Sequence, residues 1–325
     1  MSSKQAPLPS GFRPTTTTRE VLKGTDFSGK VVIVTGGYAG IGLETTRALA
    51  EVGATVIVPA RNSEKAQQAL NGIPRVEQGQ MDLLDPQSID AFAKGFLASG
   101  RPLHTLINNA GIMATPLERD SRGYESQFSA NHLGHFQLTL RLWPALLKDK
   151  GARVISLTSR GHRRNGIDFD DPNFQRHPYE RWEAYAQSKT ANVLFAVELD
   201  RRGQANDIRA FAVHPGGITT GLGRHMTDEE LQVHGLSRGA KPGFIPPGQS
   251  VTEGGILKTL EQGAATTVWC ATSPQLDGMG GVYCQDVDIA PVSPDGMQGV
   301  RPYAIDPEGA KRLWTMSEEL TGVKF

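Results

Sequence analysis

The sequence predicts an α/β fold: a single doubly wound domain in which helices cover both faces of a mostly seven-stranded parallel sheet. Two observations predict it. From residue 30 onward, short runs rich in Val and Ile alternate with longer stretches of helical character, as in a chain of βαβ units. The strand-like runs, such as residues 31–35, are apolar on both faces, which is typical of parallel strands buried between two helical layers.

Each element follows from the composition of its run and from the residues that flank it. Residues 31–35 read Val-Val-Ile-Val-Thr, and residues 54–58 have the same β-branched character. The helix expected over residues 85–98 begins at Asp85, and an acidic residue suits a helix N-terminus. The expected strands are 31–35, 54–58, 75–81, 103–107, 153–158 and 208–213; the expected helices are 41–52, 63–70, 85–98, much of 121–147 and 182–202.

Composition excludes several classes of function. Lys and Arg number 34 and Asp and Glu number 34 in a chain of 325 residues, so bulk charge attracts neither nucleic acid nor an anionic membrane. No apolar run follows the N-terminus and none approaches the ~20 residues of a membrane span, so we expect a cytoplasmic protein. Cys270, Cys284, His162 and His214 lack the spacing of metal ligands, and no metal site is expected.

Tyr185 and Lys189 are four residues apart within an expected helix, so they lie on one helical face. A neighbouring ammonium group favours the phenolate, so we expect the pKa of Tyr185 to fall from about 10 toward neutrality. Such a tyrosine can act as a general acid or base. The pattern alone is also typical of a solvated pair on a helix surface.

A glycine-rich loop joins the first expected strand to the first expected helix. Residues 35–42 read Thr-Gly-Gly-Tyr-Ala-Gly-Ile-Gly. Glycines let the backbone approach a pyrophosphate, and the helix N-terminus presents free N–H groups to it. The loop therefore predicts dinucleotide binding, rather than only a tight turn, with contacts from Gly36, Tyr38, Gly40, Ile41 and Gly42.

The end of the second strand bears on the choice of cofactor. An acidic residue here would bind the ribose hydroxyls of NAD, but the sequence reads Pro-Ala-Arg-Asn over residues 59–62. The guanidinium of Arg61 can pair with the 2′-phosphate of NADP. We therefore expect NADP(H) in preference to NAD(H).

Taken in chain order, these motifs resemble the short-chain dehydrogenase/reductase family from about residue 30 to residue 283. The resemblance implies a Rossmann fold and hydride transfer from or to a nicotinamide cofactor. Further positions that match the family's cofactor-binding and catalytic motifs are Asp82, Leu83, Asn109, Ala110, Gly111, Asn131, Ser159, Tyr185, Lys189, Pro215, Gly216, Ile218 and Thr220.

The resemblance also implies a role for each catalytic position. Ser159 would hydrogen-bond the substrate oxygen, and Tyr185 would exchange a proton with it. Lys189 would lower the tyrosine pKa and hold the nicotinamide ribose, while Asn131 would position a water that connects Lys189 to solvent.

Residues 131–136, Asn-His-Leu-Gly-His-Phe, and residues 310–317 are similar to the branch of the family that holds retinol dehydrogenases, WW-domain oxidoreductases and protochlorophyllide reductases. That branch mostly uses NADP(H), which agrees with Arg61. Two residues depart from the family pattern. Tyr38 stands where small residues are usual, and Ala39 lacks the basic side chain of some NADP-binding relatives.

The predicted function is the NADP(H)-dependent interconversion of a carbonyl and an alcohol on a mid-sized, partly apolar small molecule. The alternatives are a C=C reductase and a non-catalytic protein that senses NADP. Relatives include monomers, dimers and tetramers, so a homo-oligomer stays open.

Three segments lie outside the βα alternation. We expect residues 1–29 to form an N-terminal arm before a dinucleotide-binding catalytic domain at residues 30–290, and residues 291–325 to form a C-terminal extension. Residues 216–255 are rich in Gly and Pro. We interpret them as a substrate lid, with a disordered surface insertion as the alternative.

Overall fold

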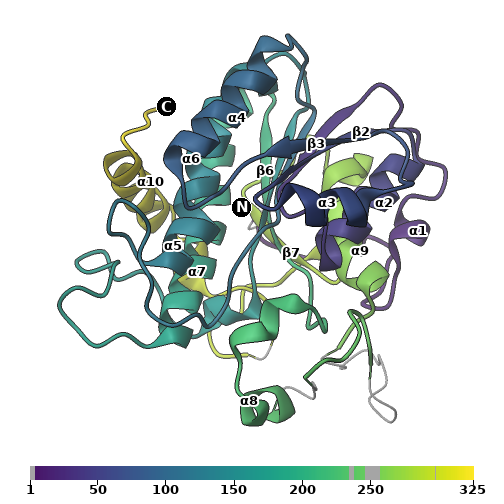
Figure 1. The fold of residues 1–325 in the computed structure, drawn as a ribbon. Helices are drawn as coiled ribbons and strands as arrows, with labels where there is room; N and C mark the ends of the chain where they lie inside the picture. Colours follow the sequence, from purple (N-terminus) through teal and green to yellow (C-terminus); the bar gives the residue numbers. More distant parts are fainter. Residues whose placement is uncertain (1–3, 234–237, 246–256, 297) are drawn as a thin grey trace.

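The computed structural model describes residues 4–233, 238–245, 257–296 and 298–325 (Figure 1). Its strands are β1 (Val31–Val34), β2 (Thr55–Ala60), β3 (Val76–Gln80), β4 (Thr105–Asn108), β5 (Arg153–Leu157), β6 (Arg209–His214), β7 (Val282–Gln285) and β8 (Asp288–Ile289). They form one sheet in the order β3-β2-β1-β4-β5-β6-β7-β8. All are parallel except β8, which pairs antiparallel with β7. The predicted fold class is confirmed, with β8 as a two-residue addition.

Helices cover both faces of the sheet (Figure 1). On one face lie α2 (Gly40–Glu51), α3 (Ser63–Leu70) and α9 (Leu260–Thr272); on the other lie α4 (Pro86–Ala98), α6 (Gly134–Leu146), α7 (Arg181–Gly203) and α10 (Pro307–Thr321). Side chains alternate between faces along a strand. Ile33 accordingly joins the core of the α4–α6–α7 side, whereas Val32 and Val34 join the core beneath α2 and α9.

The strand order creates a crevice at one edge of the sheet. The chain winds outward from β1 through β2 to β3, and outward in the other direction from β4 to β7. The loops that follow β1 and β4 therefore diverge at the carboxyl ends of adjacent strands, where open α/β sheets bind their ligands. Residues 35–42 and 109–113 follow these two strands.

The long helix expected within residues 121–147 is broken. A short helix α5 (Ser126–Phe128) runs into a π-helical turn at Ser129–Leu133, and α6 begins only at Gly134. The backbone N–H of Gly134 bonds to the carbonyl of Ser129, five residues back. Sequence periodicity does not show such a turn, because it inserts one residue into an otherwise helical pattern. Asn131 lies in it.

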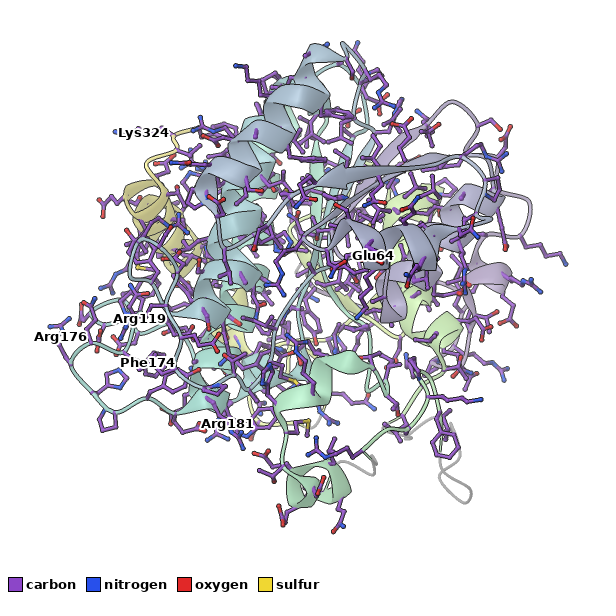
Figure 2. All side chains as sticks on the ribbon, in the orientation of Figure 1. Glu64, Arg119, Phe174, Arg176, Arg181 and Lys324 are labelled. Atoms are coloured by element: carbon purple, nitrogen blue, oxygen red, sulfur yellow. The ribbon has the colours of Figure 1, made fainter. Side chains whose placement is uncertain are left out.

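The loop between β5 and α7 is tied to the segment before α5. Arg119 donates hydrogen bonds to the carbonyls of Asn173 (2.9 Å) and Phe174 (3.1 Å), and Figure 2 shows Arg119 and Phe174 at this side of the molecule. Phe174 adopts a positive φ of 52°.

The segment at residues 216–255, predicted to be a lid, contains a 3₁₀ turn (Gly221–His225) and α8 (Asp228–Val233). Its residues 234–237 and 246–255 lie outside the described residues.

Both terminal segments pack on the domain. In the N-terminal segment, α1 (Thr18–Val21) packs on α9, and the side chain of Gln5 bonds to the backbone of Tyr283 and Ala290. At the other end, Trp314 of α10 lies buried on α7, with the guanidinium of Arg202 4.4 Å from its ring centroid. The two ends therefore complete the hydrophobic layers of the sheet.

Candidate active site

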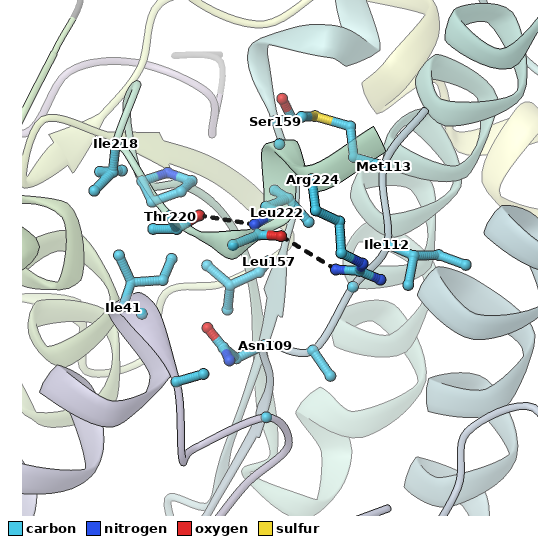
Figure 3. Close-up of a pocket in the computed structure, with 18 of the residues that line it drawn as sticks. Ile41, Asn109, Ile112, Met113, Leu157, Ser159, Ile218, Thr220, Leu222 and Arg224 are labelled. Atoms are coloured by element: carbon cyan, nitrogen blue, oxygen red, sulfur yellow. Dashed lines mark hydrogen bonds between the residues drawn. The ribbon is translucent and has the colours of Figure 1, made fainter. Parts of the chain in front are cut away.

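A cavity of about 1340 Å³ opens at the carboxyl ends of the strands, along the crevice beside β1 and β4. Figure 3 shows part of its wall, with Ser159, Asn109 and Ile218 arranged around it. Most of the residues predicted from sequence line it: Gly36, Tyr38, Gly40, Ile41, Arg61, Asp82, Leu83, Asn109, Ala110, Gly111, Ser159, Tyr185, Lys189, Pro215, Gly216, Ile218 and Thr220. Gly42 and Asn131 lie behind the wall and contact residues that form it.

The glycine loop needs its glycines for two separate reasons. Gly36 and Gly40 have positive φ values of 65° and 54°, a conformation that side chains with a Cβ rarely adopt. Gly42 is required by space, since a Cβ there would lie 2.4 Å from the carbonyl oxygen of Gly36. The loop thus folds tightly back onto the first turn of α2.

The N-terminus of α2 is open to the cavity. No side chain caps it, since the N-cap is Ala39, and no acidic residue lies in its first turn. Its free N–H groups and the positive end of the helix dipole therefore face the cavity without a competing negative charge. These features fit a pyrophosphate group.

Thr35 joins this loop to the turn after β4. Its hydroxyl accepts hydrogen bonds from the backbone N–H groups of Asn109 (2.9 Å) and Ala110 (3.0 Å). The side-chain amide of Asn109 in turn donates to the carbonyl of Thr35 at 2.8 Å. The two sides of the crevice are thereby held in one fixed arrangement.

Two basic side chains line the cavity where β2 ends and α3 begins. Arg61 and Lys65 both line the cavity, as does Asp82. Lys65 follows the N-cap Asn62, whose side chain accepts from the Lys65 backbone N–H at 2.9 Å. Lys65 is not among the residues predicted from the sequence. Its spacing of four residues from Arg61, across the start of α3, is the signal that could have found it.

Ser159 and Tyr185 meet across a tight turn. The hydroxyl of Ser159 caps the 3₁₀ turn Arg160–Arg163 by accepting from the backbone N–H of Gly161 at 3.0 Å. A Cβ on Gly161 would lie only 3.0 Å from the Tyr185 ring. Gly161 therefore lets the phenol approach Ser159, and a hydrogen bond with Ser159 lowers the pKa of Tyr185.

Burial outweighs that hydrogen bond. Tyr185 is 5% exposed, and burial raises its pKa to about 12. The ammonium of Lys189 lies 5.7 Å from the Tyr185 ring centroid, but burial lowers the lysine's own pKa to about 8. The expectation of a Tyr185 pKa near neutrality is therefore wrong. Helical spacing brought the two groups together, but it could not show that both would be removed from water, which penalises both charged forms.

Lys189 and Asn131 are fixed by backbone groups. The ammonium of Lys189 donates to the carbonyl of Leu157 at 3.1 Å. The side chain of Asn131 accepts from the N–H of Ile112 (2.9 Å) and donates to the carbonyl of Ile112 (3.0 Å) and to Ser188 (2.9 Å). Asn131 therefore holds the turn after β4 against α7. The role of positioning a water stays a prediction.

The loop after β6 packs against Lys258, a residue not predicted from the sequence. Gly216 has a φ of 95°, and a Cβ there would lie 2.8 Å from the Lys258 side chain. Lys258 is 4% exposed and pairs with Asp286 at 2.5 Å. Its backbone N–H also bonds to the carbonyl of Gly217 at 2.7 Å. No local pattern predicts this support, because Lys258 follows the irregular Gly/Pro-rich segment.

Beyond Tyr185 the cavity wall combines apolar side chains with charged ones, among them Arg160, Arg164, Arg224, Glu229 and Glu230. Met113, Trp182, Leu222, Met226 and Leu231 line this part, from three segments of the chain. Figure 3 labels Met113, Leu222, Ser159 and Arg224 among the residues that line the cavity. This composition fits the mid-sized, partly apolar substrate predicted from the variable segments.

Within the ranges that the structure describes, no cluster of three or more His, Cys, Asp or Glu side chains could hold a metal ion. In the same ranges, no helix is both long enough and apolar enough to cross a bilayer.

Known proteins resemble this chain along most of its length. The family model for short chain dehydrogenase matches residues 30–231. A protein of Streptomyces lividans named as a probable oxidoreductase is 41% identical over 298 residues, which are 89% of this chain and 96% of that protein. Retinol dehydrogenase 12 of Homo sapiens is 38% identical over 303 residues, 91% of this chain and 88% of that protein.

Solved structures also resemble this chain in fold. A crystal structure of an uncharacterized protein from Mycobacterium Paratuberculosis has a TM-score of 0.73 and 32% identity, with 96% of this chain and 99% of that chain covered. The Pseudomonas aeruginosa RhlG/NADP active-site complex, at 21% identity and a TM-score of 0.62 over 80% of this chain and 95% of that chain, shares the fold. Because the family model covers more than half of the sequence and relatives above 30% identity span most of it, this chain belongs to the short-chain dehydrogenase/reductase family of oxidoreductases.

Proposed function

We propose that the protein reduces a carbonyl to an alcohol with NADPH, on a mid-sized and partly apolar small molecule. One observation carries this proposal. A single cavity joins a protonated Tyr185 and its partner Ser159 to an uncapped helix N-terminus and to the two cations Arg61 and Lys65. The alcohol oxidation is the same path in reverse.

The cavity's residues fit a nicotinamide dinucleotide. The glycine loop and the α2 N-terminus would hold its pyrophosphate, and Pro215 to Thr220 would lie along its nicotinamide half. When bound, such a cofactor supplies the hydride. Everything else in the reaction falls to the protein's own side chains.

Ser159 and Tyr185 are arranged to act on a substrate oxygen. The Ser159 hydroxyl would donate a hydrogen bond that polarises the carbonyl, and the Tyr185 hydroxyl would deliver the proton to the oxygen. With a pKa of about 12, Tyr185 holds its proton at physiological pH. The ammonium of Lys189 would then stabilise the phenolate left behind.

Arg61→Ala tests the preference for NADPH. Losing a charged hydrogen-bond partner of the 2′-phosphate costs about 1.5–3 kcal/mol, so we expect the Kd for NADPH to rise by about 10- to 100-fold. The Kd for NADH should change little, because NADH lacks that phosphate. Fluorescence titration with both cofactors measures the effect, and Arg47→Ala on α2, outside the cavity lining, is the control. Equal losses for the two cofactors would contradict the assignment.

The pH dependence should differ between the two directions. Lys189 is charged below about pH 8 and neutral above it, whereas Tyr185 stays protonated to far higher pH. For carbonyl reduction we expect a plateau below pH 8 and a decline above it, because neutral Lys189 no longer stabilises the phenolate. Alcohol oxidation needs the phenolate as base, so its rate should rise with pH. Profiles of kcat for wild type and Lys189→Met check this: the variant should be slow and show no break near pH 8.

A panel of carbonyls and alcohols, followed by NADPH absorbance and product analysis, tests the function itself. Oxidation of NADPH that yields an alcohol supports the proposal. A saturated product with its carbonyl intact would instead identify a C=C reductase. Tight NADPH binding without turnover of any compound would identify a sensor.

A further inference from the structure

The turn that carries Ser159 is held from the C-terminal side of the chain. Residues 298–305, here called the C-terminal strap, contact the 3₁₀ turn Arg160–Arg163 at three places. Arg163 donates two hydrogen bonds to the carbonyl of Gly299, at 3.1 and 2.9 Å. The backbone N–H of Arg301 donates to a ring nitrogen of His162 at 3.3 Å, and the Tyr303 hydroxyl donates to the His162 carbonyl at 2.7 Å.

The ring of His162 connects the strap to Ser159 directly. Its Nδ1 lies 2.7 Å from the carbonyl oxygen of Ser159, and its Nε2 faces the N–H of Arg301. A carbonyl only accepts and a backbone N–H only donates. Nδ1 must therefore carry the proton and Nε2 must accept, so only the neutral Nδ1–H form satisfies both neighbours.

The surroundings maintain that form. His162 is fully buried, and its ring lies 5.0 Å from that of Tyr283. Burial, with added repulsion from Arg163 and Arg301, lowers the pKa of His162 to about 4. The strap is itself held by residues 291–293. Val300 is buried and its backbone N–H donates to the carbonyl of Pro291, and the Arg301 side chain donates to the carbonyl of Ser293.

We propose that the C-terminal strap belongs to the apparatus that orients Ser159, and that His162 is the positioning residue that joins the two. The proposal rests on the function proposed above, in which Ser159 holds the substrate oxygen. The ring bonds to the Ser159 carbonyl, which also accepts from the backbone N–H of His162, and the Ser159 hydroxyl accepts from the N–H of Gly161, two residues further on. A shift of the strap would therefore move the serine relative to Tyr185.

Three substitutions at one position separate the two bonds of the ring. His162→Asn places an amide N–H near the position of Nδ1, so it keeps the bond to Ser159 and loses the bond to Arg301. His162→Gln reaches the position of Nε2, so it keeps the bond to Arg301 and loses the bond to Ser159. His162→Phe keeps a ring and loses both bonds.

We expect kcat for carbonyl reduction to fall by about 10- to 100-fold in His162→Phe and His162→Gln, because small misplacements of a catalytic group have effects of this size. His162→Asn loses only the bond to Arg301 of the strap, so its kcat should fall by about three- to fivefold, the effect of one neutral hydrogen bond of about 1 kcal/mol. The Kd for NADPH should be unchanged in all three, since the contacts of the glycine loop and of Arg61 do not involve the turn. A wild-type kcat in His162→Asn would overturn the role of the strap, and a wild-type kcat in His162→Gln would overturn the role of the ring.

Hydrogen–deuterium exchange gives a readout that does not depend on turnover. In His162→Phe, residues 157–165 and 298–305 should both exchange faster than in wild type. In His162→Asn the increase should be larger in the strap, and in His162→Gln it should be larger in the serine turn. Unchanged exchange in His162→Phe overturns the coupling even if no substrate has been found, whereas a wild-type enzyme that reduces no carbonyl contradicts only the proposed function.

A milder variant guards against misfolding. Tyr303 is 38% exposed, so Tyr303→Phe removes one bond from strap to turn with little change in packing. We expect kcat to fall by about three- to fivefold, within the effect of one neutral hydrogen bond of about 1 kcal/mol. Tyr124→Phe is the matched control, because within the described residues the Tyr124 hydroxyl has no hydrogen bond to the strap or to the turn. Identical kcat values for the two variants would contradict the role of the strap.

Discussion

Replacing Tyr185 by Phe is expected to reduce kcat for carbonyl reduction by about 10²- to 10⁴-fold, the contribution of a positioned general acid. In the proposed function this hydroxyl, which lies beside Ser159, is the proton donor, and its pKa of about 12 keeps it protonated. The phenyl ring should keep the packing against Gly161 and Trp182. The Kd for NADPH should therefore change little, so stopped-flow hydride transfer and fluorescence titration together separate lost chemistry from lost binding.

Tyr179→Phe is the matched control for this substitution. Burial also raises the pKa of Tyr179 to about 12, but its hydroxyl donates to the carbonyl of Thr115 and it does not line the cavity. This variant should lose some thermal stability and keep its kcat. Turnover at the wild-type rate in Tyr185→Phe would remove the tyrosine from the mechanism and leave Ser159 as the group to test.

Gly42→Ala is expected to weaken NADPH binding by about 10- to 100-fold, the consequence of about 1–3 kcal/mol of overpacking. The new Cβ would lie 2.4 Å from the Gly36 carbonyl oxygen and 2.4 Å from the Asn109 side chain. The backbone of the glycine loop must then move away from the α2 N-terminus. Since that backbone would hold the pyrophosphate, the loss should appear in Kd as well as in thermal stability.

Two other glycines separate these effects. Gly203, at the end of α7, is equally crowded, with a Cβ position 2.6 Å from the carbonyl of Ile208, but it lies outside the cavity lining. Gly203→Ala should lower the melting temperature and leave the Kd unchanged. Gly95 in α4 has open space around its Cβ position, so Gly95→Ala should stabilise the helix by about 0.5–1 kcal/mol. A Kd in Gly42→Ala equal to that in Gly203→Ala would show that the loop does not bind the cofactor.

The sequence predicts those parts of the site that depend on local spacing. Gly36, Gly40 and Gly42 are read from a strand, a loop and a helix in succession, and Tyr185 and Lys189 from one turn of one helix. Such features need no knowledge of the rest of the molecule, because the backbone alone places the residues. The alternation of strand and helix fixes the layers of the sheet for the same reason.

The parts that the sequence does not predict depend on contacts between distant segments. Lys258 reaches Gly216 from beyond the Gly/Pro-rich segment, and Arg301 reaches His162 across 139 residues. The pKa of Tyr185 belongs to the same class, since it depends on how much water the finished fold excludes. The π-helical turn at Asn131 escapes prediction because one inserted residue leaves the apolar pattern almost unchanged.

The N-terminal segment has a consequence for how the protein forms during synthesis. Gln5 pairs with the backbone of Tyr283 and Ala290, across 278 and 285 residues. At roughly 5–20 residues per second, a ribosome needs about 15–60 s to make the chain between these partners. During that time Gln5 cannot form these bonds, because Tyr283 and Ala290 have not yet been made. Closure of the two ends of the chain is therefore a late event, after the part of the sheet around β1 and β4 has been synthesised.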